Sequence, residues 1–513
     1  MNRTFFLLFW LKTLILFILM SKKYYYTVGL EIHAELKTKS KMFCSCKNDP
    51  DEKKPNVNIC PVCMAHPGAL PVANKKAIEH VIKVGLALGS TIADFSEFDR
   101  KNYFYPDIPK GYQISQYKYP IVSGGSLANY GITRVHLEED TANNKHFEAG
   151  SGPAKDGASY SLIDFNRAGV PLMELVTEPH TFESMEEASK TASNFAKEYQ
   201  LLLWYLEISE ANMEKGEFRV EANVSVSTEK GKLSPNYVEV KNLNSFKTVE
   251  KAIKYEYERM IELIEGGKAD EIVKETRGWD EGKQKTTSQR KKESSQDYRY
   301  FPDPDLPKMY LHEAFDLEKM KSELPELPNA IRKRFASYGI KTEDGDLLVT
   351  EPKLGLMFEA TLSCFKELFD GEMPYDPKYA ITIANFVLSD LQSINKKDPN
   401  AGFPQAEQFA VLIRRFVDGK ISSRVAKDLI PKLIYERIEV DKVLEKENLL
   451  QSNDEGALKI IVEKVISENP EVVATYKGGK ENAIMSLVGK IIKESGGSAN
   501  PQIVLKLLKE MLK

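Results

Sequence analysis

The chain has 513 residues, of which 42% are hydrophobic and 28% charged, and its formal net charge is −4. This length exceeds what one hydrophobic core usually serves, so two or three globular domains are expected. The slight negative charge excludes a uniformly basic nucleic-acid binder, and any nucleic-acid contact must come from local patches. Five cysteines in a chain of this length exclude a disulfide scaffold.

The first 19 residues are set apart from the fold. Phe5 to Met20 is almost wholly apolar and is interrupted by Lys12 and Thr13. The run is shorter than the roughly 20 residues of a membrane span, and no small-residue cleavage site follows it. Either it anchors the chain, or translation starts at Met20, which leads directly into the first strand. The second interpretation is preferred, so no membrane association is expected.

Residues 24–312 read as one unit of mixed strands and helices. Val28, Leu30 and Ile32 alternate with Glu31 and His33, which predicts a strand with one apolar and one polar face. Strands are also expected at 218–226 and 237–241, and helices at 184–207 and 248–265. The polar stretch 278–296 is expected to be a loop.

From about residue 317 the strand pattern ends and helical spacing takes over. The fold class is therefore α+β, a mixed sheet followed by an all-α region, with a helical domain at 313–440 and a helical tail at 441–513. The expected helices lie at 379–394, 406–418, 422–435, 455–469, 480–495 and 501–513.

Four of the five cysteines form two close pairs. Cys44 and Cys46 are separated by one residue, thirteen residues follow, and Cys60 and Cys63 are separated by two. Four thiolates at this spacing can surround Zn²⁺ tetrahedrally and leave no position open for water, so a structural zinc is predicted. Buried free cysteines are the alternative. A metal site of this kind suits a reducing compartment, the cytoplasm.

Acidic side chains and one histidine recur on the polar strand faces. They are Glu31 and His33, the acidic run Glu138-Glu139-Asp140 after His136, then Glu221 and Glu239. Carboxylates brought together repel one another unless a cation neutralises them, so such a grouping indicates Mg²⁺, which in turn binds ATP phosphates. Taken singly, each of these residues is more typical of a solvent-facing strand position.

The segment from Arg100 to Gln113 places cations among four aromatic rings and two prolines. Such a segment suits phosphates and stacked bases. A structural loop filled by tyrosines is the alternative. Neither a GxxxxGK[ST] loop nor a GxGxxG fingerprint occurs, which disfavours P-loop and Rossmann chemistry.

In this order, these segments resemble the B subunits of the glutamyl/aspartyl-tRNA amidotransferases, from about residue 24 to the end. The matching stretches are 28–33, the cysteine pairs, 99–116, 136–140, 164–178, 223–226, 239–246 and 297–302. One departure is Glu221, which stands where relatives often have aspartate.

The resemblance implies a cradle-shaped kinase domain, a helical domain and a tail that contacts tRNA. It implies ATP-dependent phosphorylation of the side-chain carboxylate on misacylated Glu-tRNA(Gln) or Asp-tRNA(Asn), followed by amidation with glutamine-derived ammonia. By position in the family's motifs, the catalytic residues at the Mg²⁺ and ATP site are Glu31, His33, Glu139, Glu221 and Glu239. Lys101, Tyr103, Arg299 and Tyr300 are assigned to substrate or nucleotide binding or to structural roles.

The chain carries no Gly/Ser-rich amidase signature, so a glutaminase A subunit and a small C subunit are expected as partners, together with misacylated tRNA. A zinc-stabilised tRNA-binding protein without catalysis is the alternative function. A membrane-tethered scaffold is a third, and it rests on residues 5–20 alone.

Overall fold

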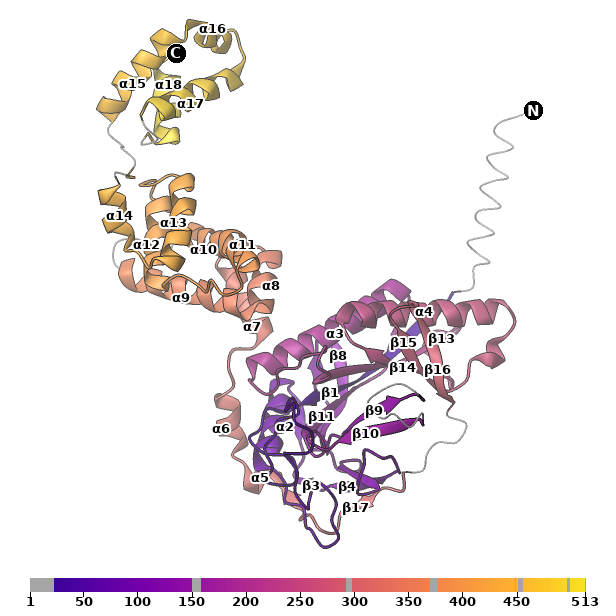
Figure 1. Ribbon diagram of the computed structural model, residues 1–513. Coiled ribbons are helices and arrows are strands. Elements are labelled where there is room, and N and C mark those ends of the chain that lie inside the picture. The colour runs from indigo at the N-terminus through magenta and orange to yellow at the C-terminus, as the bar shows by residue number, and fades with distance from the viewer. Residues whose placement is uncertain are drawn as a thin grey trace, which may run out of the picture. The chain divides into compact units, whose positions relative to one another are not determined.

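The structure, a computed structural model, describes residues 23–149, 158–291, 298–369, 377–447, 449–450, 455–495 and 499–512. It consists of two compact units, Met1–Leu327 and Pro328–Lys513 (Figure 1). The apolar leader 1–19 lies outside the described residues. Among the helices that the structure does describe, none combines the length and the apolar character needed to cross a bilayer.

The first unit is built on a mixed sheet of eleven strands. Its order is β16-β15-β14-β13-β1-β11-β8-β6-β2, with β12 paired to β1 and β7 to β8. Neighbours run antiparallel apart from β14 and β15. The strands are β1 Tyr25–Glu35, β2 Thr91–Ile92, β6 Val122–Ser123, β7 Ser126–Leu127, β8 Tyr130–Glu139, β11 Pro171–Thr177, β12 His180–Phe182, β13 Phe218–Ser227, β14 Val238–Leu243, β15 Glu275–Asp280 and β16 Lys285–Lys291.

The central strand β1 has the two faces that its alternation predicts. Val28, Leu30 and Ile32 are buried, and two long helices, α3 (Met185–Tyr205) and α4 (Phe246–Glu265), pack on this side of the sheet. Ser184 and Ser245 cap these helices, each accepting a hydrogen bond from the backbone N–H three residues ahead. The other face of β1 is left for polar side chains.

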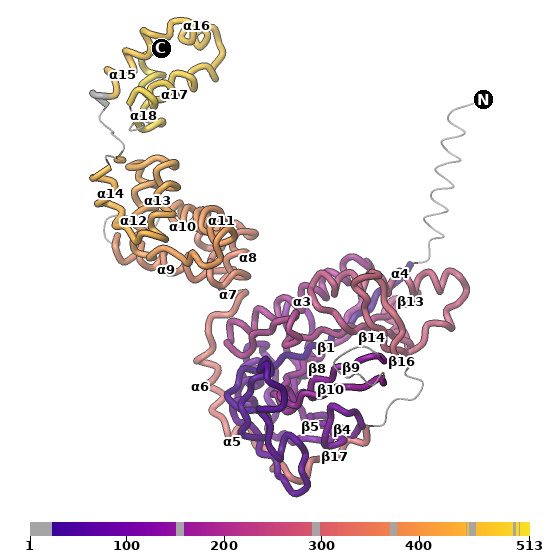
Figure 2. Tube along the Cα trace, in the orientation of Figure 1, coloured from indigo at the N-terminus to yellow at the C-terminus, as the bar shows by residue number. Residues whose placement is uncertain are grey.

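Shorter elements complete the first unit. There are three small sheets: β4 pairs with both β17 and β5, β9 pairs with β10, and β3 pairs with β18. Figure 2 traces β17 beside β4. Their strands are β3 Phe95–Ser96, β4 Asp99–Asn102, β5 Tyr112–Ser115, β9 Asn143–Phe147, β10 Tyr160–Asp164, β17 Phe301–Pro302 and β18 Met309–Tyr310. The helices are α2 Lys75–Ala87, η1 Ala269–Glu271, α5 Leu311–Ala314 and α6 Leu317–Ser322.

The prediction of a loop at 278–296 is wrong where the structure describes this stretch. Residues 275–291 form a hairpin, β15 and β16, at one edge of the large sheet. Trp279 and Thr286 are buried on it, although most of β16 is polar. An edge strand tolerates charged side chains because only one of its backbone edges is paired, which is why its pattern resembles a loop.

The named elements in the described part of the second unit are all helices, as the sequence predicts. Its helices are α7 Pro328–Ser337, α8 Thr342–Thr350, α9 Pro352–Phe369, α10 Pro377–Phe386, η2 Val387–Leu391, α11 Gln392–Lys397, α12 Ala406–Val417, α13 Ser423–Tyr435, α14 Val440–Lys446, α15 Glu455–Glu468, α16 Pro470–Lys477, η3 Glu481–Ala483, α17 Ile484–Glu494 and α18 Pro501–Met511. Residues of α15, α17 and α18 share a hydrophobic core of their own. The predicted division at 312 and 440 stays a prediction.

Candidate active site and metal centre

The polar face of β1 becomes a cluster of charges because of strand register. Glu31 lies opposite Glu221 of β13, and His33 lies opposite Glu174 of β11. Directly opposed residues on one face of an antiparallel pair have Cβ atoms about 5 Å apart, so side chains distant in sequence are brought within contact distance. Two ligand groups follow from this register.

The first group, here called the carboxylate trio, consists of Glu31, Glu221 and Glu239, whose carboxylate oxygens all lie within 4.8 Å of one another. Lys241 offsets part of the charge, with its Nζ 2.8 Å from Glu221 and 3.5 Å from Glu239. Asn223 donates to Glu31 at 2.8 Å. Burial and the neighbouring carboxylates nevertheless raise the pKa of Glu31. The charges of Glu174, Glu221 and Glu239 therefore act on Glu31 in spite of Lys241 and Asn223.

The second group, the histidine trio, consists of His33, Glu138 and Glu174, with ligand atoms again within 4.8 Å. The Nε2 of His33 lies 3.4 Å from Glu138 and 3.5 Å from Glu174. Burial alone would lower the pKa of His33, but the two carboxylates raise it to about 10. His136 approaches Glu174 from the side, at 3.2 Å. One imidazole and two carboxylates are a ligand set that divalent cations accept.

Both trios line one cleft with a cavity of about 410 Å³. Arg134, Arg219 and Lys101 contribute positive charge to its wall, and tyrosines form part of its edge. Arg219 donates to buried Asp140 at 2.7 Å, so this cation is held in place by an ion pair. A polar cleft with convergent carboxylates and cations is suited to binding a phosphorylated ligand with its metal ions.

One predicted site residue, Glu139, does not join the trios. It forms an ion pair with Lys110, accepts from the backbone N–H of Ile114 at 2.9 Å, and lines a different cavity, near the cysteines. The reason is strand alternation: Glu138 and Glu139 are consecutive on β8, so their side chains point to opposite faces. The expectation that Glu139 converges with Glu31, His33 and Glu239 is wrong, and its neighbour Glu138 takes that place.

The residues predicted for substrate or structural roles lie beside the cleft. Lys101, Tyr103 and Tyr300 line it. Arg299, with a left-handed φ of 44°, joins Tyr298 to Tyr300, although it is itself exposed.

Among the cleft residues that had no predicted role at the site are Glu174, Arg219 and Lys241. Each lies on a strand whose side chains alternate between the two faces of the sheet, within 171–177, 218–227 and 238–243. Alternation was therefore the available signal, but it places a residue at the site only once the register between strands is known.

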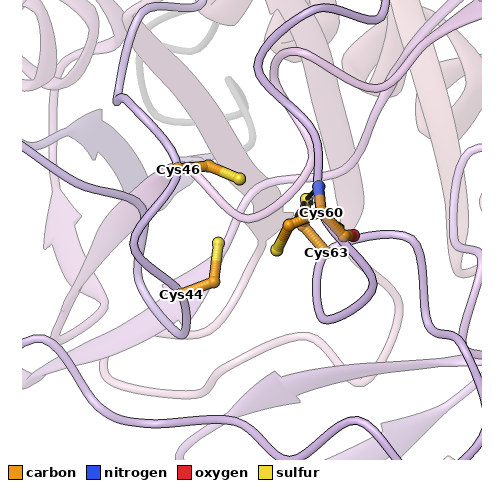
Figure 3. A group of neighbouring side chains, drawn as sticks. All are labelled: Cys44, Cys46, Cys60 and Cys63. Carbon is orange, nitrogen blue, oxygen red and sulfur yellow. Dashed lines mark hydrogen bonds between the residues drawn. The ribbon is translucent and has the colours of Figure 1, made fainter.

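The four paired cysteines form a separate centre. Their sulfur atoms lie within 4.8 Å of one another, and the two pairs come from two segments that face each other (Figure 3). None is in a disulfide. Hydrogen bonding from Cys44 lowers the pKa of Cys63 to about 5, which favours a thiolate in this cluster. The cluster could hold a metal ion such as zinc.

Two known domain families match the chain. Residues 26–316 match the family described as "GatB/GatE catalytic domain", and residues 370–512 match that described as "GatB domain". The chain belongs to the GatB family. Both trios and the cysteine centre lie within the match to the catalytic domain.

Curated relatives in the GatB family align over nearly the whole chain. A Thermotoga neapolitana protein is 41% identical over 503 residues, covering 96% of this chain and 99% of the relative. A Dehalococcoides mccartyi protein is 42% identical over 506 residues, with coverages of 96% and 99%. One from Gloeothece citriformis is 39% identical over 503 residues, with coverages of 94% and 97%. Each is named as the B subunit of an aspartyl/glutamyl-tRNA(Asn/Gln) amidotransferase. Membership in this ligase family confirms the expectation that the chain is an amidotransferase subunit.

Proposed function

We propose that this chain activates the side-chain carboxylate of glutamate or aspartate esterified to tRNA, using ATP. The observation that carries the proposal is the convergence of two metal-ligand trios on one face of the sheet, inside one cleft. Several carboxylates held together in a partly buried cleft destabilise the protein unless cations neutralise them. Such an arrangement supports a catalytic role, since active sites often retain electrostatic repulsion that destabilises the fold.

Divalent cations fit the residues present. The carboxylate trio offers hard oxygen ligands, which Mg²⁺ prefers, and the histidine trio adds one imidazole nitrogen. Because Glu31 and His33 occupy successive positions on the same face of β1, the two groups are neighbours about 6.6 Å apart along the strand. Bound cations would neutralise negative charge on a transferring phosphoryl group.

A second cavity of about 340 Å³ continues along the same sheet face and suits the base of the nucleotide. Gly29 contributes no side chain to its floor, while Leu233, Pro235 and Tyr237 supply apolar walls. Asn223 lines this cavity and also hydrogen-bonds Glu31, so the two sites adjoin. We propose that ATP lies with its base here and its phosphates at the trios.

The proposed reaction has two steps. An oxygen of the substrate carboxylate attacks the γ-phosphorus of ATP. The bond between the γ-phosphorus and the oxygen that bridges it to the β-phosphorus breaks, and ADP leaves. Ammonia then attacks the acyl carbon and loses a proton. Phosphate departs with the C–O bonding electrons and takes up that proton, which leaves the amide. Phosphorylation is needed because a carboxylate is a poor electrophile. Cleft cations such as Arg219 and Lys241 would orient the phosphates.

The partners follow from the relatives and from the chemistry. The relatives are named as B subunits, which implies further subunits. We propose that a glutaminase A subunit supplies the ammonia, that a small C subunit completes the heterotrimer, and that misacylated tRNA brings the acceptor. The cysteine centre is proposed to hold Zn²⁺ in a structural role, because all four ligands are thiolates and no ligand position is left for water.

Reconstitution with A and C partners tests the proposal. With Mg²⁺ and ATP, ADP should form only when misacylated tRNA is present, and the amide should form when glutamine is added. Supplying Glu-tRNA(Gln) and Asp-tRNA(Asn) separately assigns the substrate. The alternative of a non-catalytic, zinc-stabilised tRNA binder predicts tRNA binding without ATP cleavage. That result, obtained with an active glutaminase partner, would overturn the proposal.

A further inference from the structure

Four tyrosines at the edge of the cleft, here called the aromatic rim, form a continuous series of ring contacts: Tyr117, Tyr300, Tyr298 and Tyr103. Tyr117 and Tyr300 are stacked, with centroids 4.4 Å apart and planes 11° apart. Tyr298 meets Tyr300 and Tyr103 edge-on, at 6.1 and 5.8 Å. The two metal-ligand trios and the proposed nucleotide cavity include none of these rings.

The rim is held by the backbone around it. Asn102 donates to the carbonyl oxygens of Tyr298 and Arg299 at 3.1 and 2.9 Å, and its own backbone N–H also donates to Tyr298. Arg299 adopts a left-handed φ of 44°, a conformation that costs free energy for a non-glycine residue. Strained backbone persists where the surroundings fix it, and such positions cluster at ligand sites.

The rim is open to solvent on one side. Tyr117 is 59% exposed although its ring stacks on Tyr300, so the second face of Tyr117 is available. Lys101 lies beside the rim, with Nζ 5.1 Å from the ring centroid of Tyr298. Lys101 forms no salt bridge within the described part of the chain, although the carboxylate of Glu138 attracts its charge. An open ring face next to an ammonium is the combination with which proteins bind single-stranded nucleic acid.

We propose that the aromatic rim receives the single-stranded, aminoacylated 3′ end of the tRNA, with its terminal base stacked on Tyr117. This rests on the proposed function, which requires the acyl group to enter the cleft. The terminal base is attached to the ribose that carries the acyl group, so it is the aromatic part of the substrate nearest the reacting carboxylate. Lys101 adds charge complementarity with the nucleic-acid end.

The base of ATP is the competing occupant, and the position of the rim argues against it. In the large sheet, β13 and β14 lie on one side of β1, and β11 and β8 lie on the other. β8 contacts β5, and β5 pairs with β4, which borders the rim together with β17. The apolar cavity beside Asn223 lies farther along β1, at Thr27 and Gly29, where residues of β11 and β13 also line it, and it already suits a base. The rim and this cavity therefore offer separate surfaces for the two substrates.

The test uses the heterotrimer and three variants. Tyr117→Ala removes the ring, Tyr117→Phe keeps it, and Tyr310→Ala is a matched control, since Tyr310 is 54% exposed in the same unit and is not part of the cleft. Because stacking on an aromatic residue is worth about 1–3 kcal/mol per base, Tyr117→Ala should lower kcat/KM for misacylated tRNA by about 5-fold to 150-fold. Tyr117→Phe and Tyr310→Ala should stay close to the parent, and KM for ATP should not change.

A fluorescent adenine analogue at the 3′ end of the tRNA provides a readout that needs no catalysis. Its emission should be quenched on binding to the parent and to Tyr117→Phe, and not to Tyr117→Ala. With tRNA that lacks the terminal adenosine, the parent and Tyr117→Ala should bind equally. Unchanged quenching in Tyr117→Ala, or a raised KM for ATP in place of the tRNA effect, would overturn the inference. A parent that binds and quenches but never cleaves ATP would overturn the proposed function alone.

Discussion

Neutralising one member of the carboxylate trio should stabilise the metal-free protein and remove its response to magnesium. Glu239→Gln is the most informative change, because Thr276 donates to Glu239 at 2.6 Å and an amide oxygen can accept the same bond. The substitution therefore removes a charge and keeps the shape and the hydrogen bond. Most buried substitutions destabilise a protein, so a gain in stability would identify electrostatic repulsion as its cause.

The magnitude follows from the distances. At 4.8 Å, the upper limit of the separations within the trio, two unit charges repel by about 3.5 kcal/mol at an effective dielectric constant of about 20. Glu31 and Glu221 together therefore repel Glu239 by at least about 7 kcal/mol on this basis. Lys241, 3.5 Å away, attracts it by about 4.7 kcal/mol on the same basis. The difference leaves about 2 kcal/mol in favour of the variant. Burial and the neighbouring carboxylates raise the pKa of Glu31, and proton uptake by Glu31 reduces this difference.

Thermal unfolding with and without Mg²⁺ measures the effect. Without metal, the transition of Glu239→Gln should occur a few degrees above that of the parent; with Mg²⁺, the parent should gain stability and the variant little. Lys241→Met should shift the metal-free transition in the opposite direction, and Glu258→Gln, an exposed position on α4, should shift neither. A metal-free Glu239→Gln protein less stable than the parent, or one with the parent's full magnesium response, would refute the reasoning.

Three further predictions concern the cysteine centre, the histidine trio and the nucleotide cavity. Cys60→Ser should reduce bound zinc, measured by elemental analysis, and lower the unfolding temperature, whereas Cys364→Ser should do neither; a zinc-free parent would contradict this. Glu138→Gln should abolish tRNA-dependent ATP cleavage and leave tRNA affinity nearly unchanged in a binding titration, whereas parallel loss of tRNA binding would place this residue on the RNA surface. Gly29→Val should fill the cavity floor and raise KM for ATP without changing tRNA affinity, and an unchanged KM would exclude this cavity as the nucleotide site.

The strands and helices with strong periodicity were predictable from sequence. The alternation of Val28, Leu30 and Ile32 identified β1 and its buried face, and the expected helices 184–207 and 248–265 correspond to α3 and α4. Each of these elements buries one face against the same core, so local pattern and tertiary packing agree. At the sheet edge, local pattern and tertiary packing disagree, and the polar strand β16 was predicted to be a loop.

Glu138 and Glu139 show where sequence reasoning reaches its limit at the site. An acidic run places a carboxylate on each face of a strand, and Glu138 and Glu139 are the same residue type. Only the register of β8 relative to β1 decides which of the two faces the cleft. That register is fixed because Glu174 pairs with His33 on one side and with His136 on the other. Pairing between strands that are distant in the sequence is a tertiary property, which period-2 alternation within one strand cannot supply.

The two faces of the large sheet have different roles: one stabilises the fold, and the other carries the candidate site. On the helix side, residues such as Val28 and Ile32 are fully buried and apolar, and burying each stabilises the fold by about 1.5–3 kcal/mol. On the cleft side, the same strand carries Glu31 and His33, whose burial opposes folding unless partners or cations compensate. Strand alternation places both sets of residues on one rigid element. A strand anchored through its apolar face can hold repelling carboxylates at fixed spacing, and fixed spacing is what a metal-bound phosphoryl group requires.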